Sequence, residues 1–323
     1  MTKIIIIGPA SPLRGGISDF NEALAKSLLE KGFLVEIISF SLQYPKFLFP
    51  GKSQNRVEKT EAFNFKISPL LNSINPISWW RTAKYIKLKN PSKVFIRFWM
   101  PFFAPCLGII GKYLKRNKIP VFGIVDNAIA HEKRLGDTML VNYFLNKCDS
   151  HFTLSEKVKK DIKKINNRVS VESLFHPIYN TYSKITDKAS ALKSLNLKEG
   201  KYILFFGLIR KYKGLDLAIR AMSNKLIVEK NIKLIIAGEF YDSEERYQDL
   251  IRDLSLNNII IYNQFIANKQ VPDFFSVSNL VILPYTSATQ SGVTQLAMYY
   301  NKPMLVTNIG GLSEIIDHKK TGI

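Results

Sequence analysis

Three basic residues follow a short apolar run in the second half of the chain: Arg210, Lys211 and Lys213. The run at 202–206 has the pattern of a buried strand, and Gly207 comes directly after it. A guanidinium is a planar fork and an ammonium a point charge, and both neutralise phosphate oxygens. The pattern therefore fits a phosphate-binding loop, although a solvated loop would contain the same residue types.

A second loop with the character of an anion site spans residues 286–291. It follows an apolar run that ends at Pro284, and Gly292 opens a segment with helical periodicity. The free amides and the dipole of a helix N-terminus attract anions. The amides of Ser291, Gly292 and Val293 are therefore candidate phosphate ligands, while an ordinary loop of an α/β domain remains the alternative.

Two loops in the first half also contain candidate functional residues. In the first of them, Gly15 and Gly16 let the backbone approach a ligand closely, but the loop has no GxGxxG pattern, which disfavours a nicotinamide or flavin enzyme. In the second, Asp126 ends the strand-like run 121–125, and His131 follows. Ligands bind at the carboxyl ends of strands in open α/β sheets, so these side chains could orient a hydroxyl or accept its proton. A turn or helix cap would also explain an Asp-Asn pair.

Strand-like runs alternate with helical periodicity along the chain, which predicts parallel sheets with crossover helices. Six runs form a first series and five a second, on either side of a polar stretch. We predict two doubly wound α/β domains, at 1–182 and 201–323, with a linker at 183–200. The predicted strands are 4–8, 34–39, 94–98, 121–125, 151–153 and 171–174, then 202–206, 232–237, 259–262, 280–283 and 304–307.

Residues 41–93 are basic and irregular, and form either an acceptor or membrane face or an insertion packed on the domain. We favour packing because of Trp79 and Trp80.

The run Lys302-Pro303-Met304-Leu305-Val306-Thr307-Asn308-Ile309-Gly310-Gly311-Leu312-Ser313-Glu314-Ile315 resembles the donor-binding segment of family-4 retaining glycosyltransferases. The resemblance extends over nearly the whole chain. It implies the GT-B fold: two Rossmann-like, doubly wound parallel-sheet domains facing across a cleft, with the acceptor side at 1–182 and the nucleotide-sugar donor site at 201–323.

The same resemblance assigns roles to the candidate residues. Arg210 and Lys213, with the amides of 291–293, would hold the donor diphosphate. Gly15 and Gly16 would close over the phosphates, and Asp126 and His131 would orient the transferred sugar or the acceptor. Asn127, His131 and Glu132 match the family pattern, whereas Asp126 stands where a histidine is usual.

The chain departs from the family at two further points. Most members have two glutamates eight residues apart, the second of which binds the ribose; here these positions are Ala288 and Leu296, with Gln295 adjacent. Ribose recognition must therefore differ, with Gln295 as a candidate donor-binding residue, or nucleotide binding is lost. The family also continues beyond Ile323 with a helix that crosses back to the first domain, so we expect a C-terminal truncation.

Composition restricts the partners. The net charge is +20, and residues 1–190 contribute 30 Lys and Arg against 14 Asp and Glu, or +16. This favours an anionic partner such as a membrane surface or a lipid-phosphate acceptor, unless the proteome is generally lysine-rich.

No nucleic-acid-binding motif is present, and neither a signal peptide nor a membrane-spanning run is evident. Cys106 and Cys148 are expected as free thiols. No cluster has metal-ligand spacing, so we expect no metal and no cofactor.

We therefore predict a cytoplasmic, peripherally membrane-associated hexosyltransferase. It would move a sugar with retention from a nucleotide-sugar to a saccharide or lipid-linked acceptor, in cell-surface polysaccharide or glycolipid synthesis. A nucleotide-sugar 2-epimerase is the alternative enzyme. A catalytically weak nucleotide-binding homologue is the non-enzymatic alternative, which the missing glutamates favour.

Overall fold

The structure is a computed structural model of the chain. It describes residues 2–45, 49, 51, 53–56, 63–129, 134–178, 182–320 and 322–323. The chain forms two compact units, Met1–His176 and Pro177–Ile323. The predicted linker at 183–200 belongs to the second unit and contains a helix, because Ala191 and Leu192 are buried within that unit.

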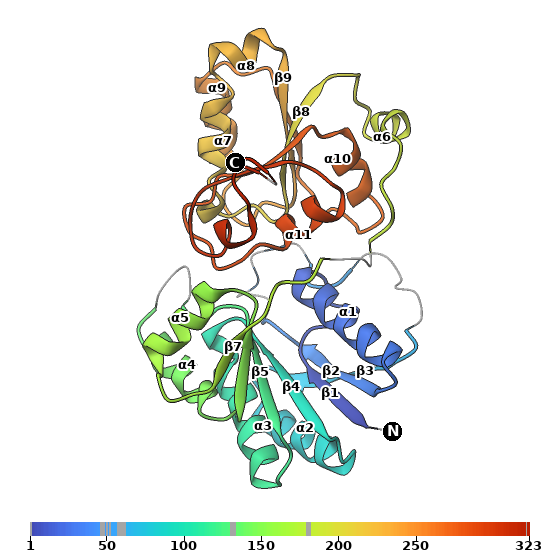
Figure 1. Ribbon diagram of the computed structural model, residues 1–323, viewed down its shortest axis with the longest axis vertical. Coiled ribbons are helices and arrows are strands. Elements are labelled where there is room, and N and C mark those ends of the chain that lie inside the picture. Colours follow the sequence, from blue (N-terminus) through green and yellow to red (C-terminus); the bar gives the residue numbers. More distant parts are fainter. Residues whose placement is uncertain are drawn as a thin grey trace. The chain divides into compact units, whose positions relative to one another are not determined.

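The first unit is built on a seven-stranded parallel sheet with the order β3-β2-β1-β4-β5-β6-β7 (Figure 1). The order runs outward in both directions from β1 and β4, so the carboxyl ends of these two strands form the topological switch point. The strands are β1 (Lys3–Ile7), β2 (Leu34–Leu42), β3 (Lys66–Asn72), β4 (Lys93–Phe98), β5 (Val121–Val125), β6 (Ser150–Thr153) and β7 (Val171–Ser173).

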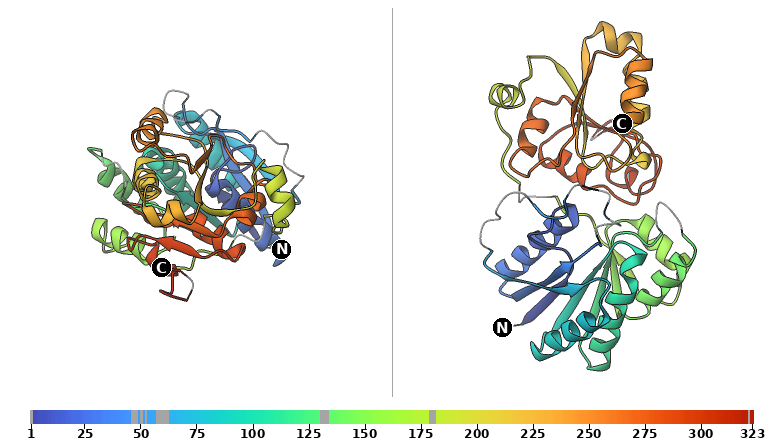
Figure 2. Two further views of the ribbon diagram at one scale, coloured as in Figure 1. Left: turned by 90° about the horizontal axis from the view of Figure 1, so that it is seen from above. Right: turned by 180° about the vertical axis from the view of Figure 1, so that it is seen from behind.

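Helices cover both faces of this sheet. On one face α1 packs on Ile6, Val35 and Ile37. On the other face a larger core joins the sheet to α2, α3, α4 and α5, and includes the stacked rings of Phe98 and Phe144 (Figures 1 and 2). The helices are α1 (Gly16–Glu30), α2 (Pro76–Leu88), α3 (Ala104–Arg116), α4 (Asp137–Leu145) and α5 (Glu156–Ile165), with a 3-10 turn η2 (Pro101–Phe103).

The second unit has a five-stranded parallel sheet with the order β10-β9-β8-β11-β12. Helices α7 and α9 pack on one core, and α6 contacts α10 on the other side of the strands (Figure 1). The strands are β8 (Lys201–Phe206), β9 (Ile232–Ala237), β10 (Ile259–Tyr262), β11 (Leu280–Leu283) and β12 (Met304–Val306). The helices are α6 (Lys188–Ser194), α7 (Leu215–Ala221), α8 (Lys225–Glu229), α9 (Glu245–Asp253), α10 (Val271–Val277) and α11 (Gly292–Tyr299), with 3-10 turns η3 (Lys211–Lys213) and η4 (Ser313–Ile315).

All eleven predicted strands are present, and the two parallel-sheet α/β units are confirmed. The prediction that region 41–93 is irregular is wrong, because the region contains both β3 and α2. Within α2 the side chain of Trp79 is buried, as packing requires, but Trp80 is 50% exposed. Among the described residues, no helix combines the length and the apolar character needed to cross a bilayer.

Candidate functional site

The turn after β8 brings Lys213 to the carboxyl end of the sheet in the second unit. Gly207 directly follows the strand with φ of +95°, and the chain passes through Arg210 into η3. Gly214 then opens α7 with φ of +67°, and a Cβ there would lie 1.9 Å from the carbonyl oxygen of Pro284. Only glycine fits so close an approach, which holds the turn against the end of β11.

Lys213 is a buried lysine, with 8% of its surface exposed. Its Nζ is 3.3 Å from the position of a Cβ on Gly207 and 5.5 Å from the ring centroid of Tyr285. Burial, with a smaller contribution from the charge of Arg210, lowers the Lys213 pKa to about 7. No ion pair joins Lys213 to a carboxylate of the described residues. A buried ammonium without a counter-ion is costly, and an anionic ligand would relieve that cost.

The N-terminus of α11 lies at the same place. Ser291 caps the helix and its Oγ accepts the amide of Val293 at 3.3 Å. The Val293 Cγ2 atom is 3.5 Å from the position of a Cβ on Gly207, so α11 and Lys213 both border this glycine. The structure thus brings together Lys213, Ser291, Gly292 and Val293. The Val293 amide would have to leave the Ser291 hydroxyl before it could bind a phosphate oxygen.

The loop between β11 and α11 is fixed by contacts from three directions. The Thr286 amide donates to the carbonyl of Tyr212 at 2.7 Å, and the Thr307 hydroxyl donates to the carbonyl of Tyr285 at 2.6 Å. A Cβ on Gly310, whose φ is +49°, would lie 1.7 Å from the Ala288 carbonyl oxygen. Gly310, the first glycine of the pair in the 302–315 motif, is therefore explained by close packing against this loop, which positions the helix N-terminus in advance of ligand binding.

Other predicted donor-binding residues have different environments. The Arg210 side chain is exposed, and its guanidinium carbon lies 5.1 Å from the ring centroid of Tyr241. Gln295 is 2% exposed, within α11. Ala288 and Leu296, at the positions where the sequence resemblance leads one to expect glutamates, are both buried apolar residues. The described structure therefore has packed core at these two positions instead of carboxylates.

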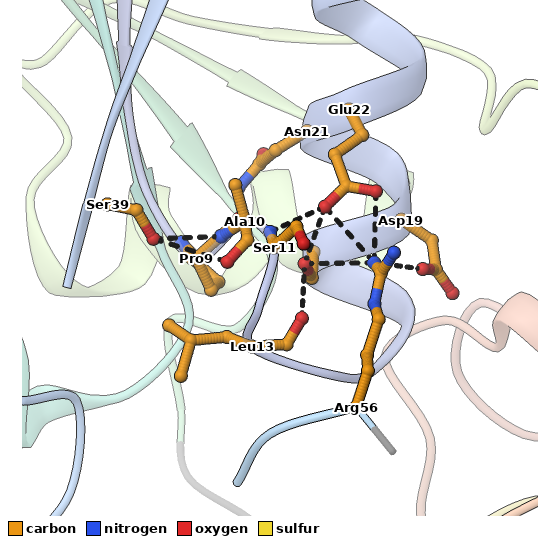
Figure 3. A network of polar contacts seen from close by, with 10 residues as sticks. Pro9, Ala10, Ser11, Leu13, Asp19, Asn21, Glu22, Ser39 and Arg56 are labelled. Atoms are coloured by element: carbon orange, nitrogen blue, oxygen red, sulfur yellow. Dashed lines mark hydrogen bonds and ion pairs between the residues drawn. The ribbon is translucent and has the colours of Figure 1, made fainter. Parts of the chain in front are cut away.

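In the first unit, Gly15 and Gly16 form the start of α1. Gly15 is the N-cap with φ of +113°, and a Cβ there would meet no atom within 4 Å. The positive φ favours glycine, and the open space leaves the backbone accessible to a ligand. The loop that precedes these glycines is held by a polar network, drawn in Figure 3.

Arg56 is the centre of this network. Its Nη2 donates to Asp19 at 2.7 Å and to Glu22 Oε2 at 3.0 Å, and Glu22 Oε1 accepts the amide of Ser11 at 2.7 Å (Figure 3). Burial raises the Glu22 pKa, against the lowering effect of the Arg56 charge. The network fixes the loop onto the first turns of α1, so the glycine pair belongs to a structured loop.

Asp126 is 3% exposed, and its carboxylate is hydrogen-bonded to the guanidinium of Arg97 in β4. The Arg97 Nε donates to Asp126 Oδ2 at 2.6 Å, and Nη2 donates to Oδ1. The Arg97 guanidinium carbon is also 4.0 Å from the ring centroid of Phe20. Both carboxylate oxygens accept hydrogen bonds from the Arg97 guanidinium, which holds the carboxylate in one orientation and suits a positioning role. His131 lies outside the described residues.

Sequence reasoning missed several residues of these sites. Arg97 lies in an apolar strand run, and its partner Asp126 follows 29 positions later, so spacing gave no signal. Tyr285 and Gly207 border Lys213 and were identifiable only as neighbours of the two loops. No group of three or more metal-ligating side chains occurs among the described residues.

Comparison with known proteins places these observations in a family context. Residues 187–323 match the model of the family described as Glycosyl transferases group 1. An uncharacterized glycosyltransferase of Methanocaldococcus jannaschii is 28% identical over 180 residues, 53% of this chain and 45% of that protein. A putative glycosyltransferase, YtcC of Bacillus subtilis, is 29% identical over 188 residues, 53% of this chain and 46% of that protein. The chain thus matches about half the length of these curated relatives.

Among solved structures, the Anabaena protein Alr3699/HepE in complex with UDP and glucose superimposes with a TM-score of 0.75. The two chains are 14% identical, and the match covers 98% of this chain and 84% of that one. At this identity the likeness shows the fold alone, and it shows the GT-B fold, as the sequence predicts.

Proposed function

We propose that the protein is a glycosyltransferase that moves a sugar from a nucleotide-sugar to an acceptor hydroxyl, with retention at the anomeric carbon. The observation that carries the proposal is the buried ammonium of Lys213, which has no carboxylate partner among the described residues and lies beside the N-terminus of α11. The family match of residues 187–323 supports it, since that segment contains Arg210, Lys213 and the N-terminus of α11.

The chemistry required of such a site is stabilisation of a departing nucleoside diphosphate. As the bond between the anomeric carbon and the diphosphate oxygen breaks, negative charge grows on the diphosphate and the sugar gains oxocarbenium character. Lys213 and Arg210 supply positive charge at the β8 end, and the α11 amides supply hydrogen-bond donors. Because the surrounding loops are already fixed, the main reorganisation is the release of the Val293 amide from the Ser291 hydroxyl. These groups act without a metal ion, and we propose no cofactor.

The first unit would provide the acceptor side. Gly15 and Gly16 offer an accessible backbone at the start of α1, and the Arg97–Asp126 pair offers a fixed polar group at the carboxyl ends of β4 and β5. We assign Asp126 to positioning, and His131 to orientation of the sugar or acceptor. A saccharide or lipid-linked acceptor at the cytoplasmic face of a membrane, in polysaccharide or glycolipid synthesis, fits the charge of +16 over residues 1–190.

Two alternative functions would use the same site, and one of them has specific support. A nucleotide-sugar 2-epimerase would use the same diphosphate site and would convert the donor without any acceptor. A nucleotide-binding homologue with little turnover is favoured by the apolar residues Ala288 and Leu296 at the positions of the family's glutamates.

The test is incubation of the protein with a panel of nucleotide-sugars, with and without mixed saccharide and lipid-linked acceptors. Acceptor-dependent release of nucleoside diphosphate supports transfer, and NMR of the anomeric proton then reports retention. Epimerised donor in the absence of acceptor selects the epimerase, and binding without product selects the binding homologue.

Lys213→Met and Lys211→Met form a matched pair for this assay. Lys211 is exposed and only two residues from Lys213. Release should fall by at least tenfold in Lys213→Met and change little in Lys211→Met, because only the buried ammonium is desolvated. Equal rates in both variants would remove Lys213 from the site.

A further inference from the structure

We propose that the outer faces of α2 and α3 form a docking surface for an anionic phospholipid bilayer. This α2–α3 surface consists of Ile77, Trp80, Arg81, Lys84, Lys87 and Leu88 of α2 and Ile109, Lys112 and Arg116 of α3. It gives the proposed membrane association a defined location. Its test uses no catalysis, so its failure would be distinct from failure of the proposed sugar transfer.

The exposed side chains of α2 form one continuous stripe. At about 100° per residue, the exposed positions of the helix fall within an arc of roughly 140°. The opposite side of the helix is buried against the sheet through Trp79, Ala83 and Ile86. The stripe contains three large apolar side chains that are 50–84% exposed, and otherwise Pro76 and basic residues. A water-facing helix would have polar residues of both signs here.

Trp80 and Lys84 show the pattern in one pair. The Trp80 ring is half exposed, and the Lys84 ammonium lies 3.7 Å from its centroid. An aromatic ring with a cation at its face suits the interface between acyl chains and headgroups, where the ring sits below the phosphates and the ammonium reaches them.

Helix α3 extends the surface. It packs beside α2 on the same face of the sheet, so the two helices turn their outer faces in the same direction (Figures 1 and 2). Its exposed residues include Ile109, Lys112 and Arg116, at the spacing of one helical stripe. Both helices therefore present apolar and basic side chains together.

The charge of the segment selects an anionic partner. Residues 63–125 contain eleven Lys and Arg residues and no Asp or Glu. A groove of about 460 Å³ runs beside the stripe, bordered by Arg81, Asn75 and Tyr85, and could accommodate a headgroup. Scattered single apolar residues need no explanation, but apolar and basic side chains concentrated on adjacent helices match an anionic interface.

The experiment is flotation of the whole chain with vesicles of phosphatidylcholine alone or with 30% phosphatidylglycerol (about one anionic lipid in three, enough for a negative surface potential). We expect binding to the anionic vesicles only. The triple variant Arg81→Ala, Lys84→Ala, Lys87→Ala should partition on the order of 100-fold less, since each basic residue near such a surface contributes about fivefold. Leu226→Ser with Lys230→Glu, in the exposed α8 of the second unit and at its C-cap, is the matched control and should bind normally.

Insertion is tested through Trp80. Lipids brominated on the acyl chains should quench part of the tryptophan fluorescence, and this quenching should disappear in Trp80→Phe. Three results would each overturn the proposal: equal binding to neutral vesicles, full binding by the triple variant, or identical quenching in Trp80→Phe. Binding to an acidic polynucleotide with no binding to vesicles would also overturn it, in favour of a nucleic-acid partner.

Discussion

Replacing Asp126 by Asn should destabilise the first unit strongly. The substitution keeps the shape of the side chain but leaves the Arg97 guanidinium, 2% exposed, without its counter-ion. Removing one partner of a buried ion pair costs about 3–5 kcal/mol. With a urea slope of about 2 kcal/mol per molar, the unfolding midpoint should fall by about 1.5–2.5 M.

The assay is tryptophan fluorescence during urea unfolding. All three tryptophans, Trp79, Trp80 and Trp99, lie in the first unit, so the signal reports that unit alone. The double variant Arg97→Met, Asp126→Leu removes both charges and should recover much of the loss, because apolar pairs often replace buried ion pairs at little cost. A change below about 1 kcal/mol in Asp126→Asn, or a double variant less stable than the single one, would refute a buried, structurally required pair.

Three further predictions concern other sites. The pKa of Lys213 is lowered to about 7, so its side chain is mostly neutral at pH 8. A bound diphosphate raises that pKa, so binding at pH 8 should take up close to one proton. The affinity should therefore fall as the pH rises above 7. Calorimetry in buffers of different ionisation enthalpy measures this uptake, which should vanish in Lys213→Met. Gly310→Ala should weaken nucleoside diphosphate binding by at least tenfold, because the new Cβ would overlap the Ala288 carbonyl oxygen. Gly136 also has a positive φ, but a Cβ there would meet no atom within 4 Å, so Gly136→Ala should leave binding unchanged. Equal affinities in titrations of both variants would contradict the packing argument. Burial raises the pKa of Cys106 to about 12 and that of Cys148 as well, so neither thiol should react with a disulfide reagent at pH 8 until the protein unfolds.

Buried parallel strands were predictable because each is a nearly continuous apolar run bounded by turn residues. The runs at β5, β9, β10 and β11 end where the sequence predicts. The edge strand β3 has no such run, since Pro69 interrupts it and Leu70 is exposed. Helix α2 was missed because its outer face contains apolar residues, which hides the usual amphipathic periodicity.

The candidate site was predictable in part for similar reasons. Lys213 and the start of α11 each follow a strand, so sequence order placed both at the same edge of a parallel sheet. The burial of Lys213 depends on Tyr285 and Gly207, which long-range packing brings to it. The pairing of Arg97 with Asp126 depends on the register between β4 and β5, which no local pattern encodes.

The most direct test of the central claim is calorimetric titration of a nucleoside diphosphate into the wild-type protein, Lys213→Met and Lys211→Met at one pH and salt concentration. Loss of a charged hydrogen bond costs about 1.5–3 kcal/mol, or roughly 10- to 150-fold in affinity. We predict a loss of this size in Lys213→Met and wild-type affinity in Lys211→Met. Unchanged affinity in Lys213→Met, or no binding of any nucleoside diphosphate to the wild-type protein, would contradict a phosphate site at the carboxyl end of β8.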